Sequence, residues 1–359
     1  MSHPKAHLET TKPERVVVWR VTEQCNLGCA FCAFDRRLKF PRLQAQATLV
    51  ERVAQLLMQW SQLRGERLLL SWLGGEPLLV PWLLPLSEKL RALERASPLD
   101  LALSLTTNGT RLSDARVRHK LLANFTEITV SIDAWGRAHD RLRGWAGGFH
   151  ALEHSLQRLF DERVVLGSGM RVRINVVLMR STIAEFPALC DALSLWPISE
   201  ISFNALGGRD RPEFYLENAL TAQDIDTFAQ ALPTLRATLA AKNIRLLGDE
   251  NYLKRLKQIA NRWAMPVPDC QPGQHFLFID ERGRVAPCHF TSDEYGVPLD
   301  ELQSLNDLDK VLKRFALNQA QRPASACADC LSTQVFGKFS EVQKQFLPSI
   351  SPAILETRV

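Results

Sequence analysis

Six alternations between short apolar runs and helical stretches constrain the fold of this chain more than any other feature of its sequence. The strand-like runs occupy residues 16–21, 68–73, 101–106, 128–132, 171–179 and 200–206. Strands that alternate with helices in this way pair in parallel, because each helix returns the chain to the same end of the sheet. The pattern predicts an α/β fold with a parallel sheet, either open and doubly wound or curved into a partial barrel.

Polar motifs follow the first three of these strands at their carboxyl ends. Cys25 comes after the first strand, Gly74 after the second and Thr107 after the third. Open parallel sheets and β/α barrels both bind their ligands at this edge. We therefore expect the active site there.

Length and composition are those of a globular protein with room for a large domain and a smaller module. The chain has 359 residues, 46% of them apolar, and its net charge of +5 is spread along the sequence. So diffuse a charge does not indicate a nucleic-acid partner. The N-terminus lacks the apolar core of a signal peptide, and the most apolar run, residues 77–86, is too short and proline-broken to cross a membrane. We expect a cytoplasmic protein without a membrane partner, and we interpret this run as the start of a buried helix.

The first group of cysteines has the spacing CxxxCxxC and consists of Cys25, Cys29 and Cys32. Eight cysteines in a chain without an export signal indicate metal ligation rather than disulfides, because the cytosol keeps thiols reduced. Three thiolates on one loop suit three corners of a [4Fe–4S] cluster and leave its fourth iron open to a small chelating molecule. The alternatives are buried free thiols, or a zinc site that takes a fourth ligand from elsewhere.

These cysteines and the motifs after them resemble the radical S-adenosylmethionine (SAM) superfamily. The segment from Gly74 through Gly75 and Glu76 to Pro77 is similar to the GGEP motif of that family, and residues 106–110 are similar to its TNG segment. The resemblance implies a partial (β/α)6 barrel in which the cysteines hold a SAM-binding [4Fe–4S] cluster. It also implies that Phe31 packs near the adenine and that Gly74, Gly75 and Glu76 bind the SAM amino group. Glycines permit this close approach, and a carboxylate matches an ammonium group.

The ends of the third and fourth strands supply further candidates for SAM binding. In relatives with a C-terminal cluster domain, a serine and a following arginine contact the SAM carboxylate, and the matching residues here are Ser131 and Arg143. Arginine suits this role because its fork binds a carboxylate through two hydrogen bonds. The alternative for Arg143 is a surface salt bridge. Asn108, Asp133 and Asn204 are weaker candidates for ribose or substrate contacts, since polar residues at strand ends also form turns.

Four more cysteines, Cys270, Cys288, Cys327 and Cys330, form a second group in the C-terminal part. Their spacing fits either a zinc site or a fully ligated iron–sulfur cluster. The expected hairpin, with its turn at residues 281–283, and the CxxC pair after a helix near residues 305–316 resemble the twitch module, a short relative of the SPASM domain. A full SPASM domain needs about seven cysteines, so we expect one auxiliary [4Fe–4S] cluster.

The expected organisation has four parts. These are an N-terminal tail (1–14), the radical SAM partial barrel (15–208), a charged helical linker (209–262) and a twitch-like or SPASM-like auxiliary cluster domain (263–359). Only about twenty residues precede the first cluster, too few for a fused peptide-recognition domain.

The resemblance implies an oxidising enzyme. The first cluster would cleave SAM to give a 5′-deoxyadenosyl radical that removes a substrate hydrogen, and the closed second cluster would accept the electron that the oxidation releases. We expect side-chain oxidation or crosslinking of a ribosomally made peptide or natural-product precursor. The alternative is a dehydrogenase of a small polar metabolite such as an aminocyclitol alcohol. Expected partners are a flavodoxin-type or ferredoxin-type electron donor and a separate peptide-recognition protein. A noncatalytic iron–sulfur or zinc scaffold would explain the cysteines alone.

The remaining reactive side chains have simpler interpretations. Cys190 lies on an apolar helical face and is expected to be an inert buried thiol. His139 and His289 are expected to be structural or exposed. The basic run of Arg36, Arg37, Lys39 and Arg42 would steer an acidic partner or simply form a solvated loop, and the sequence favours the second.

Overall fold

The computed structural model describes residues 12–207, 211–267 and 270–333. Each of the six predicted strands forms and pairs in parallel with the next. The strands are β1 (Glu14–Thr22), β2 (Arg67–Gly74), β3 (Leu101–Thr107), β4 (Glu127–Ser131), β5 (Arg171–Leu178) and β6 (Glu200–Ala205). The predicted α/β fold with a partial barrel is confirmed.

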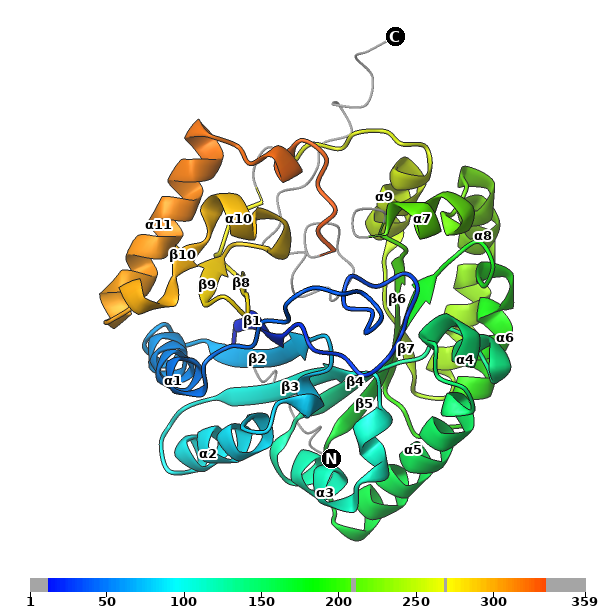
Figure 1. Cartoon of the computed structure of the whole chain (residues 1–359), viewed down its shortest axis with the longest axis horizontal. Helices are drawn as coiled ribbons and strands as arrows, with labels where there is room; N and C mark the ends of the chain where they lie inside the picture. Colours follow the sequence, from blue (N-terminus) through cyan, green and yellow to red (C-terminus); the bar gives the residue numbers. More distant parts are fainter. Residues whose placement is uncertain (1–11, 208–210, 268–269, 334–359) are drawn as a thin grey trace, which may run out of the picture.

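Four short strands extend this sheet on both sides. Next to β6 lies β7 (Arg245–Leu246), and next to β1 lies β8 (Phe276–Ile279), both in parallel. The antiparallel strands β9 (Arg284–Ala286) and β10 (Val297–Pro298) complete the order β10-β9-β8-β1-β2-β3-β4-β5-β6-β7. Segments from the expected linker and from the expected C-terminal module therefore continue the same sheet as the barrel strands (Figure 1).

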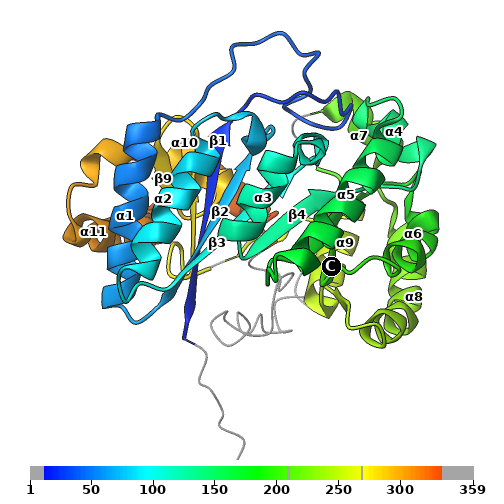
Figure 2. The same ribbon diagram turned by 90° about the horizontal axis from the view of Figure 1, so that it is seen from below.

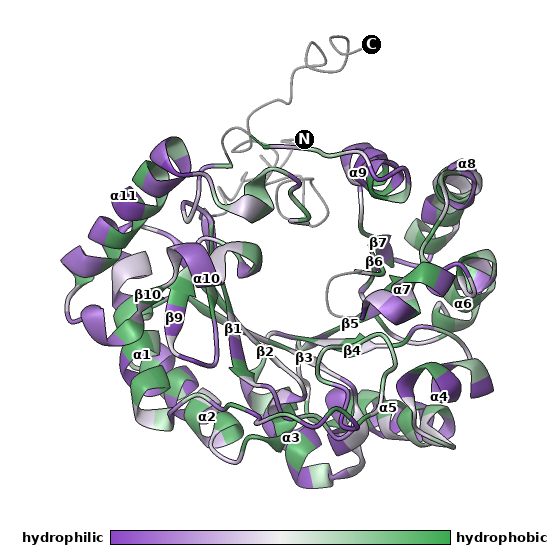
Figure 3. Ribbon diagram, turned by 45° about the horizontal axis from the view of Figure 1, so that its top comes forward, coloured by the Kyte–Doolittle hydropathy of each residue, from purple (hydrophilic) through white to green (hydrophobic). Residues whose placement is uncertain are grey.

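The α-helices of the described residues are α1 (Ala47–Leu63), α2 (Leu83–Arg95), α3 (Ala115–Asn124), α4 (Arg137–Arg143), α5 (Gly148–Val165), α6 (Phe186–Leu193), α7 (Pro212–Asn218), α8 (Ala222–Ala240), α9 (Glu250–Ala260), α10 (Ser292–Tyr295) and α11 (Leu305–Gln321). Helices such as α1, α2, α3, α5, α6 and α8 cover the outer face of the curved sheet, whereas the short α10 lies on its inner side (Figures 2 and 3). Within the described ranges, no helix is long and apolar enough to cross a membrane.

Local signals explain where several helices begin. Thr221 and Asp224 form a reciprocal capping box at the start of α8, and Ser304 and Asp307 form another at the start of α11. The apolar run of residues 77–86, interpreted from the sequence as the start of a buried helix, is divided into two short parts in the structure. It forms a 3₁₀ turn at Pro77–Leu79, and α2 begins only at Leu83, after Pro81, because proline lacks the N–H that a continuing helix would need.

The two faces of the barrel strands differ in chemistry. On β3 the leucines Leu103 and Leu105 are buried in the core beneath the helices, whereas Ser104, between them in sequence, points to the opposite face. Ser104 donates or accepts a hydrogen bond with Ser71 of β2 at 3.1 Å. The alternation recurs on the neighbouring strands, where Ile174 and Ile201 are core residues. The inner wall is therefore rich in hydroxyl and amide groups.

Candidate functional site

The loop between β1 and α1 carries the first three cysteines. The backbone N–H of Leu27 donates to Sγ of Cys25 at 3.5 Å, and that of Phe34 donates to Sγ of Cys32 at 3.3 Å. Amide donors directed at sulfur favour the thiolate over the thiol. Burial opposes this effect, since it raises the pKa of Cys25 and raises that of Cys29 to about 12. The loop therefore suits a cationic group that would convert these thiols to thiolates.

The two glycines after β2 bring that segment into close contact with the cysteine loop. The N–H of Gly75 donates to the carbonyl of Thr22 at 2.8 Å, and the N–H of Glu76 donates to that of Gln24 at 2.7 Å. A β-carbon on Gly75 would lie 2.3 Å from the Gln24 carbonyl oxygen, so a larger residue would force the two segments apart. The predicted proximity of the two motifs is present.

The carboxylate of Glu76 is fully buried and links the second strand to the third. Its Oε1 accepts hydrogen bonds from the Thr107 hydroxyl at 2.8 Å and from the N–H of Leu78 at 3.1 Å, and its Oε2 accepts one from the N–H of Asn108 at 2.7 Å. Burial raises the pKa of Glu76 to about 7, although these donors lower it. By lone-pair count, Oε2 keeps one acceptor position for a further donor.

Asn26 and Thr110 join this network, and the sequence reasoning missed both. The side-chain amide of Asn108 donates to Oδ1 of Asn26 at 2.9 Å and lies 3.7 Å from Sγ of Cys25, while Nδ2 of Asn26 donates to the Thr110 hydroxyl at 2.9 Å. A chain of hydrogen bonds thus runs from Glu76 through Asn108 to the first cysteine. The position of Asn26 directly after Cys25 was the available signal.

Arg143 and Asp133 meet on the other side of the cysteine loop. Nε of Arg143 lies 2.7 Å from Oδ2 of Asp133, and the other carboxylate oxygen accepts the N–H of Val177 at 2.9 Å. Burial alone would lower the pKa of Arg143, but the neighbouring charges of Asp133, Cys29 and Cys32 together outweigh it and raise this pKa. The guanidinium carbon is 5.4 Å from the centre of the Phe31 ring, and the Arg143 carbonyl accepts the N–H of Gly28 at 3.2 Å. Arg143 is therefore a buried cation rather than a surface one.

The remaining candidates lie around this pair. Ser131 ends β4, two residues before Asp133, and pairs in register with Asn175 of β5. The Phe31 ring lies 6.1 Å from that of Phe214 on α7. Asn204, near the end of β6, donates to Oδ1 of Asn175 at 3.2 Å. All of these residues lie at the carboxyl edge of the sheet, as expected.

Asp35 organises the basic run after the first cysteines. Burial would raise the pKa of Asp35, but bonds from Arg37 and Arg211 lower it to about 2. Arg42 donates to the carbonyls of Asp35, at 2.7 Å, and of Leu38, at 3.2 Å. Arg37 and Arg42 therefore brace the loop internally, which differs from a simple solvated run, because Arg37 pairs with the buried Asp35 carboxylate and Arg42 binds backbone carbonyls of the loop. Arg36 and Lys39 are exposed.

The four C-terminal cysteines line one hollow of about 890 Å³, its open mouth included. Sulfur atoms of this set receive polar contacts: Nε2 of Gln319 lies 3.5 Å from Sγ of Cys270, and the N–H of Ser332 lies 3.4 Å from that of Cys330. Burial raises the pKa of Cys270 to about 12 and that of Cys330 to about 11. Among the described residues, no three Cys, His, Asp or Glu side chains form a set that could hold a single metal ion.

The eighth cysteine and the two histidines singled out in the sequence lie largely as expected. Cys190 is fully buried in the core, where burial raises its pKa. His139 is also buried, its ring packs against Phe149, and burial lowers its pKa to about 4. His289 is exposed and its ring lies 5.0 Å from that of Phe278.

The chain is similar to curated proteins with several different names. It is 28% identical over 207 residues to the pre-heme d1 synthase of Dinoroseobacter shibae, covering 56% of this chain and 47% of that protein. It is 23% identical over 314 residues to the AdoMet-dependent heme synthase of Oleidesulfovibrio alaskensis, covering 82% of this chain and 75% of that protein. The chain thus spans about half the length of the first of these relatives.

Solved structures share the fold. The structure of anSMEcpe with bound AdoMet and Cp18Cys peptide superposes with a TM-score of 0.64 at 17% identity, covering 89% of this chain and 88% of that one. Streptococcus suis SuiB bound to precursor peptide SuiA gives 0.59 at 16% identity, covering 82% and 64%.

The family model described as the radical SAM superfamily matches residues 19–193, the span that contains the first cysteine loop, Glu76, Asn108 and the Asp133–Arg143 pair. Members of this superfamily share a [4Fe–4S] cluster and bound SAM. Residues 19–193 therefore form a radical SAM domain.

Proposed function

We propose that Cys25, Cys29 and Cys32 hold the [4Fe–4S] cluster of this domain and that SAM binds beside it. When bound and reduced, this group supplies the cleavage of SAM into methionine and a 5′-deoxyadenosyl radical. The fit is supported by the donor set of three adjacent thiols and by the amide N–H groups directed at Cys25 and Cys32. The hydrogen-bond chain through Asn108 orients the first of these thiols.

The surrounding residues supply matched charges for SAM in this proposal. Arg143 stays cationic and offers its two terminal nitrogens to a carboxylate, and Phe31 presents a ring face beside it for the adenine. Glu76 offers its remaining acceptor position to the amino group, next to the carbonyls of Gly74 and Gly75. Ser131, Asn108 and Asp133 complete the proposed set.

We further propose that Cys270, Cys288, Cys327 and Cys330 ligate an auxiliary [4Fe–4S] cluster in a twitch-like module that begins near residue 263. The observation that supports it is the hollow that all four cysteines line together. Four thiolates saturate every iron of a cubane, so the natural task of such a cluster is electron transfer. Gln319 and Ser332 would stabilise the thiolates through N–H donors.

The proposed reaction is oxidation or crosslinking of a side chain in a ribosomally made peptide or natural-product precursor. The fold shared with two enzymes whose structures contain a bound peptide favours this substrate class. The expected partners remain a flavodoxin-type or ferredoxin-type electron donor and a separate peptide-recognition protein, in a cytoplasmic setting. The match of residues 19–193 to the radical SAM superfamily argues against a noncatalytic scaffold.

A second candidate is dehydrogenation of a small polar metabolite, and the inner wall of the barrel favours it. On that wall, Oδ1 of Asn175 accepts hydrogen bonds from the Ser202 hydroxyl at 2.8 Å and from Asn204 at 3.2 Å, and Ser71 bonds to Ser104. Hydroxyls and amides of this kind match a polar substrate, because each buried polar group needs a partner.

Anaerobic reconstitution tests the proposed function directly. We expect about eight irons per chain, from two cubanes, and release of 5′-deoxyadenosine on reduction in the presence of SAM. Candidate peptides and polar metabolites are then incubated with the enzyme, and a product that has lost two hydrogens is sought by mass spectrometry. About four irons per chain, or zinc in the C-terminal site, would contradict the auxiliary cluster.

A further inference from the structure

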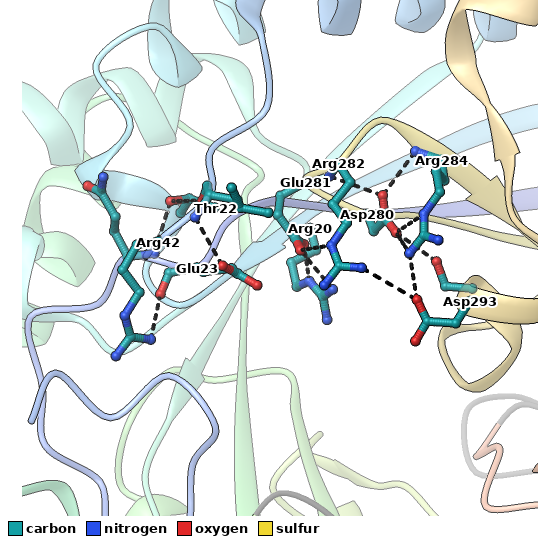
Figure 4. A network of polar contacts seen from close by, with 12 residues as sticks. Arg20, Thr22, Glu23, Arg42, Asp280, Glu281, Arg282, Arg284 and Asp293 are labelled. Atoms are coloured by element: carbon teal, nitrogen blue, oxygen red, sulfur yellow. Dashed lines mark hydrogen bonds and ion pairs between the residues drawn. The ribbon is translucent and has the colours of Figure 1, made fainter. Parts of the chain in front are cut away.

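Arg20 of β1 lies between the first cysteine loop and the hairpin of β8 and β9. Its Nε and Nη2 donate to the two carboxylate oxygens of Glu281, in the turn of that hairpin, with Nη2 3.2 Å from Oε1 (Figure 4). The Glu281 side chain is fully buried, and that of Arg20 is only 16% exposed. A buried, two-point pair of this kind fixes both partners in one geometry.

The guanidinium of Arg20 also lies near two aromatic rings, one from the first cysteine loop and one from β8. Its central carbon lies 5.5 Å from the centre of the Phe34 ring and 5.4 Å from that of the Phe278 ring. Both distances are within the range of cation–π attraction. Phe34 belongs to the first cysteine loop, whereas Phe278 belongs to β8. Arg20 is therefore a shared contact of two segments more than two hundred residues apart in sequence.

Each of these two phenylalanines lies next to one of the cysteine groups. The N–H of Phe34 donates to Sγ of Cys32 at 3.3 Å. The Phe278 ring lies 5.0 Å from the ring of His289, the residue after Cys288. Contacts thus run without interruption from one cysteine group to the other, and Arg20 is in the middle of them.

Further hydrogen bonds hold the turn that contains Glu281 in one conformation. Oδ1 of Asp280 accepts the N–H groups of Arg282 and Arg284, and its Oδ2 accepts the hydroxyl of Ser292 at 2.8 Å. Asp293 pairs with Arg284 at 2.8 Å (Figure 4). A turn braced on both sides cannot adjust if Arg20 is removed, so the loss falls on the packing of Phe34 and Phe278.

We propose that Arg20 is a positioning residue that fixes the first cysteine loop relative to the C-terminal cysteine group and thereby sets the gap in which substrate is oxidised. The inference rests on the proposed function in one respect: the second group must hold a cluster for the gap to matter in catalysis. The positioning itself concerns side chains of this chain alone.

The test compares three variants of the full chain. Arg20→Met removes the charge and the flat guanidinium, Arg20→Lys keeps the charge but loses the fork, and Arg52→Met is the matched control. Arg52 of α1 also binds the C-terminal part, through the carbonyls of Leu299 and Leu302, and within the described residues neither of these hydrogen bonds reaches a cysteine group. Because Arg20→Met leaves the buried Glu281 unpaired, the double variant Arg20→Met with Glu281→Gln provides a folded alternative.

Hydrogen exchange of the metal-free protein measures positioning without any cluster. We expect exchange at least about tenfold faster in both residues 31–36 and residues 276–279 of Arg20→Met, with partial protection in Arg20→Lys. Arg52→Met should change exchange around residues 299–302 only. Unchanged exchange in the cysteine loop of both Arg20→Met and the double variant, or an equal effect of Arg52→Met, would overturn the proposal.

Electron paramagnetic resonance of the reconstituted, reduced protein provides the second readout. With iron content unchanged, the magnetic interaction between the two sites should differ between Arg20→Met and the parent and be the same in Arg52→Met and the parent. An identical interaction in Arg20→Met and the parent would count against Arg20 as the spacer. If the parent binds only about four irons, the auxiliary cluster fails, whereas the exchange measurement still decides the role of Arg20.

Discussion

Arg143 and Asp133 form a buried ion pair, with Nε of the arginine 2.7 Å from Oδ2 of the aspartate. The sequence suggested separate tasks for them, one at the SAM carboxylate and one at the ribose. In the structure they form one unit, because Asp133 lies against the Nε edge of the guanidinium. Asp133 is itself held by the N–H of Val177.

The first prediction follows from this unit. Asp133→Asn removes the charge that orients Arg143, so SAM affinity should fall about 10-fold or more, the equivalent of one hydrogen bond to a charged group. Equilibrium dialysis of reconstituted protein measures it. Glu162→Gln is the control, since it weakens a comparable pair with Arg118 on the outer helices and should leave SAM binding unchanged. Equal affinity in Asp133→Asn and the parent would show that Arg143 needs no such partner.

Glu76 leads to a prediction about stability and pH. In the metal-free protein its pKa is about 7, raised by burial from 4.5. Between these values the folded state holds a proton that the unfolded state has lost, so stability falls as pH rises through this window and levels off above it. Urea unfolding from about pH 5 to about pH 8 should show this slope in the parent and lose it in Glu76→Gln, which cannot titrate. Identical slopes in both proteins would contradict the buried carboxyl.

The same variant should also weaken SAM binding. Glutamine replaces one acceptor oxygen by an NH₂ group, which then faces the Thr107 hydroxyl or the N–H of Leu78 or Asn108. We expect a loss of about 1–3 kcal/mol in SAM binding, with iron content unchanged. Calorimetry of the reconstituted protein measures it. Binding at parental strength would exclude a contact between Glu76 and the SAM amino group.

A third prediction concerns Asn26, which the structure adds to the site. Asn26→Ala removes the acceptor for Asn108 and the donor for Thr110, so the segment after β3 loses two of its links to the cysteine loop. We expect slower cluster assembly and a loss of about 1–2 kcal/mol in stability. Asn26→Asp, which keeps the acceptor, should be milder. The check is the rate of iron incorporation followed by absorbance, and equal rates for Asn26→Ala and the parent would remove Asn26 from the site.

The barrel strands could be predicted from sequence because their signal is local. Each strand is a short apolar run followed by a helix, so the parallel pairing follows from chain order. The pairing of β8 with β1 has no such signal. It joins Val16 to Phe276, and only the folded chain shows that a C-terminal segment returns to the first strand.

The sequence predicted most of the residues that form the site, but not which of their side chains pair with one another. Cys25, Glu76 and Asn108 were chosen from motifs, and they do meet. The pairing of Arg143 with Asp133 depends on the end of α4, where Gly144 adopts a left-handed conformation with φ of +59° and packs against Gly28. A β-carbon there would lie 2.7 Å from the Gly28 carbonyl, a tertiary contact that no periodicity reveals.

The last prediction separates a redox role of the C-terminal cysteines from a structural one. Cys327→Ala combined with Cys330→Ala should remove about four irons per chain and leave the first cluster in place. The 5′-deoxyadenosine should still form, because the first cysteine loop is intact, while the oxidised product is lost for want of an electron acceptor.

Folding must be monitored in this variant, because metal binding and folding are coupled and the segment around Cys330 also has metal-independent contacts. The N–H of Cys330 donates to the carbonyl of Met265 at 3.2 Å, and the neighbouring Asp329 pairs with the buried Arg255 at 2.7 Å. Alanine substitution preserves both contacts, so circular dichroism should remain close to that of the parent. Asp329→Asn is the matched control: it weakens the same segment but keeps all four thiols, and it should retain the cluster and form product. Normal product formation by the double cysteine variant would show that the second group has no part in the oxidation.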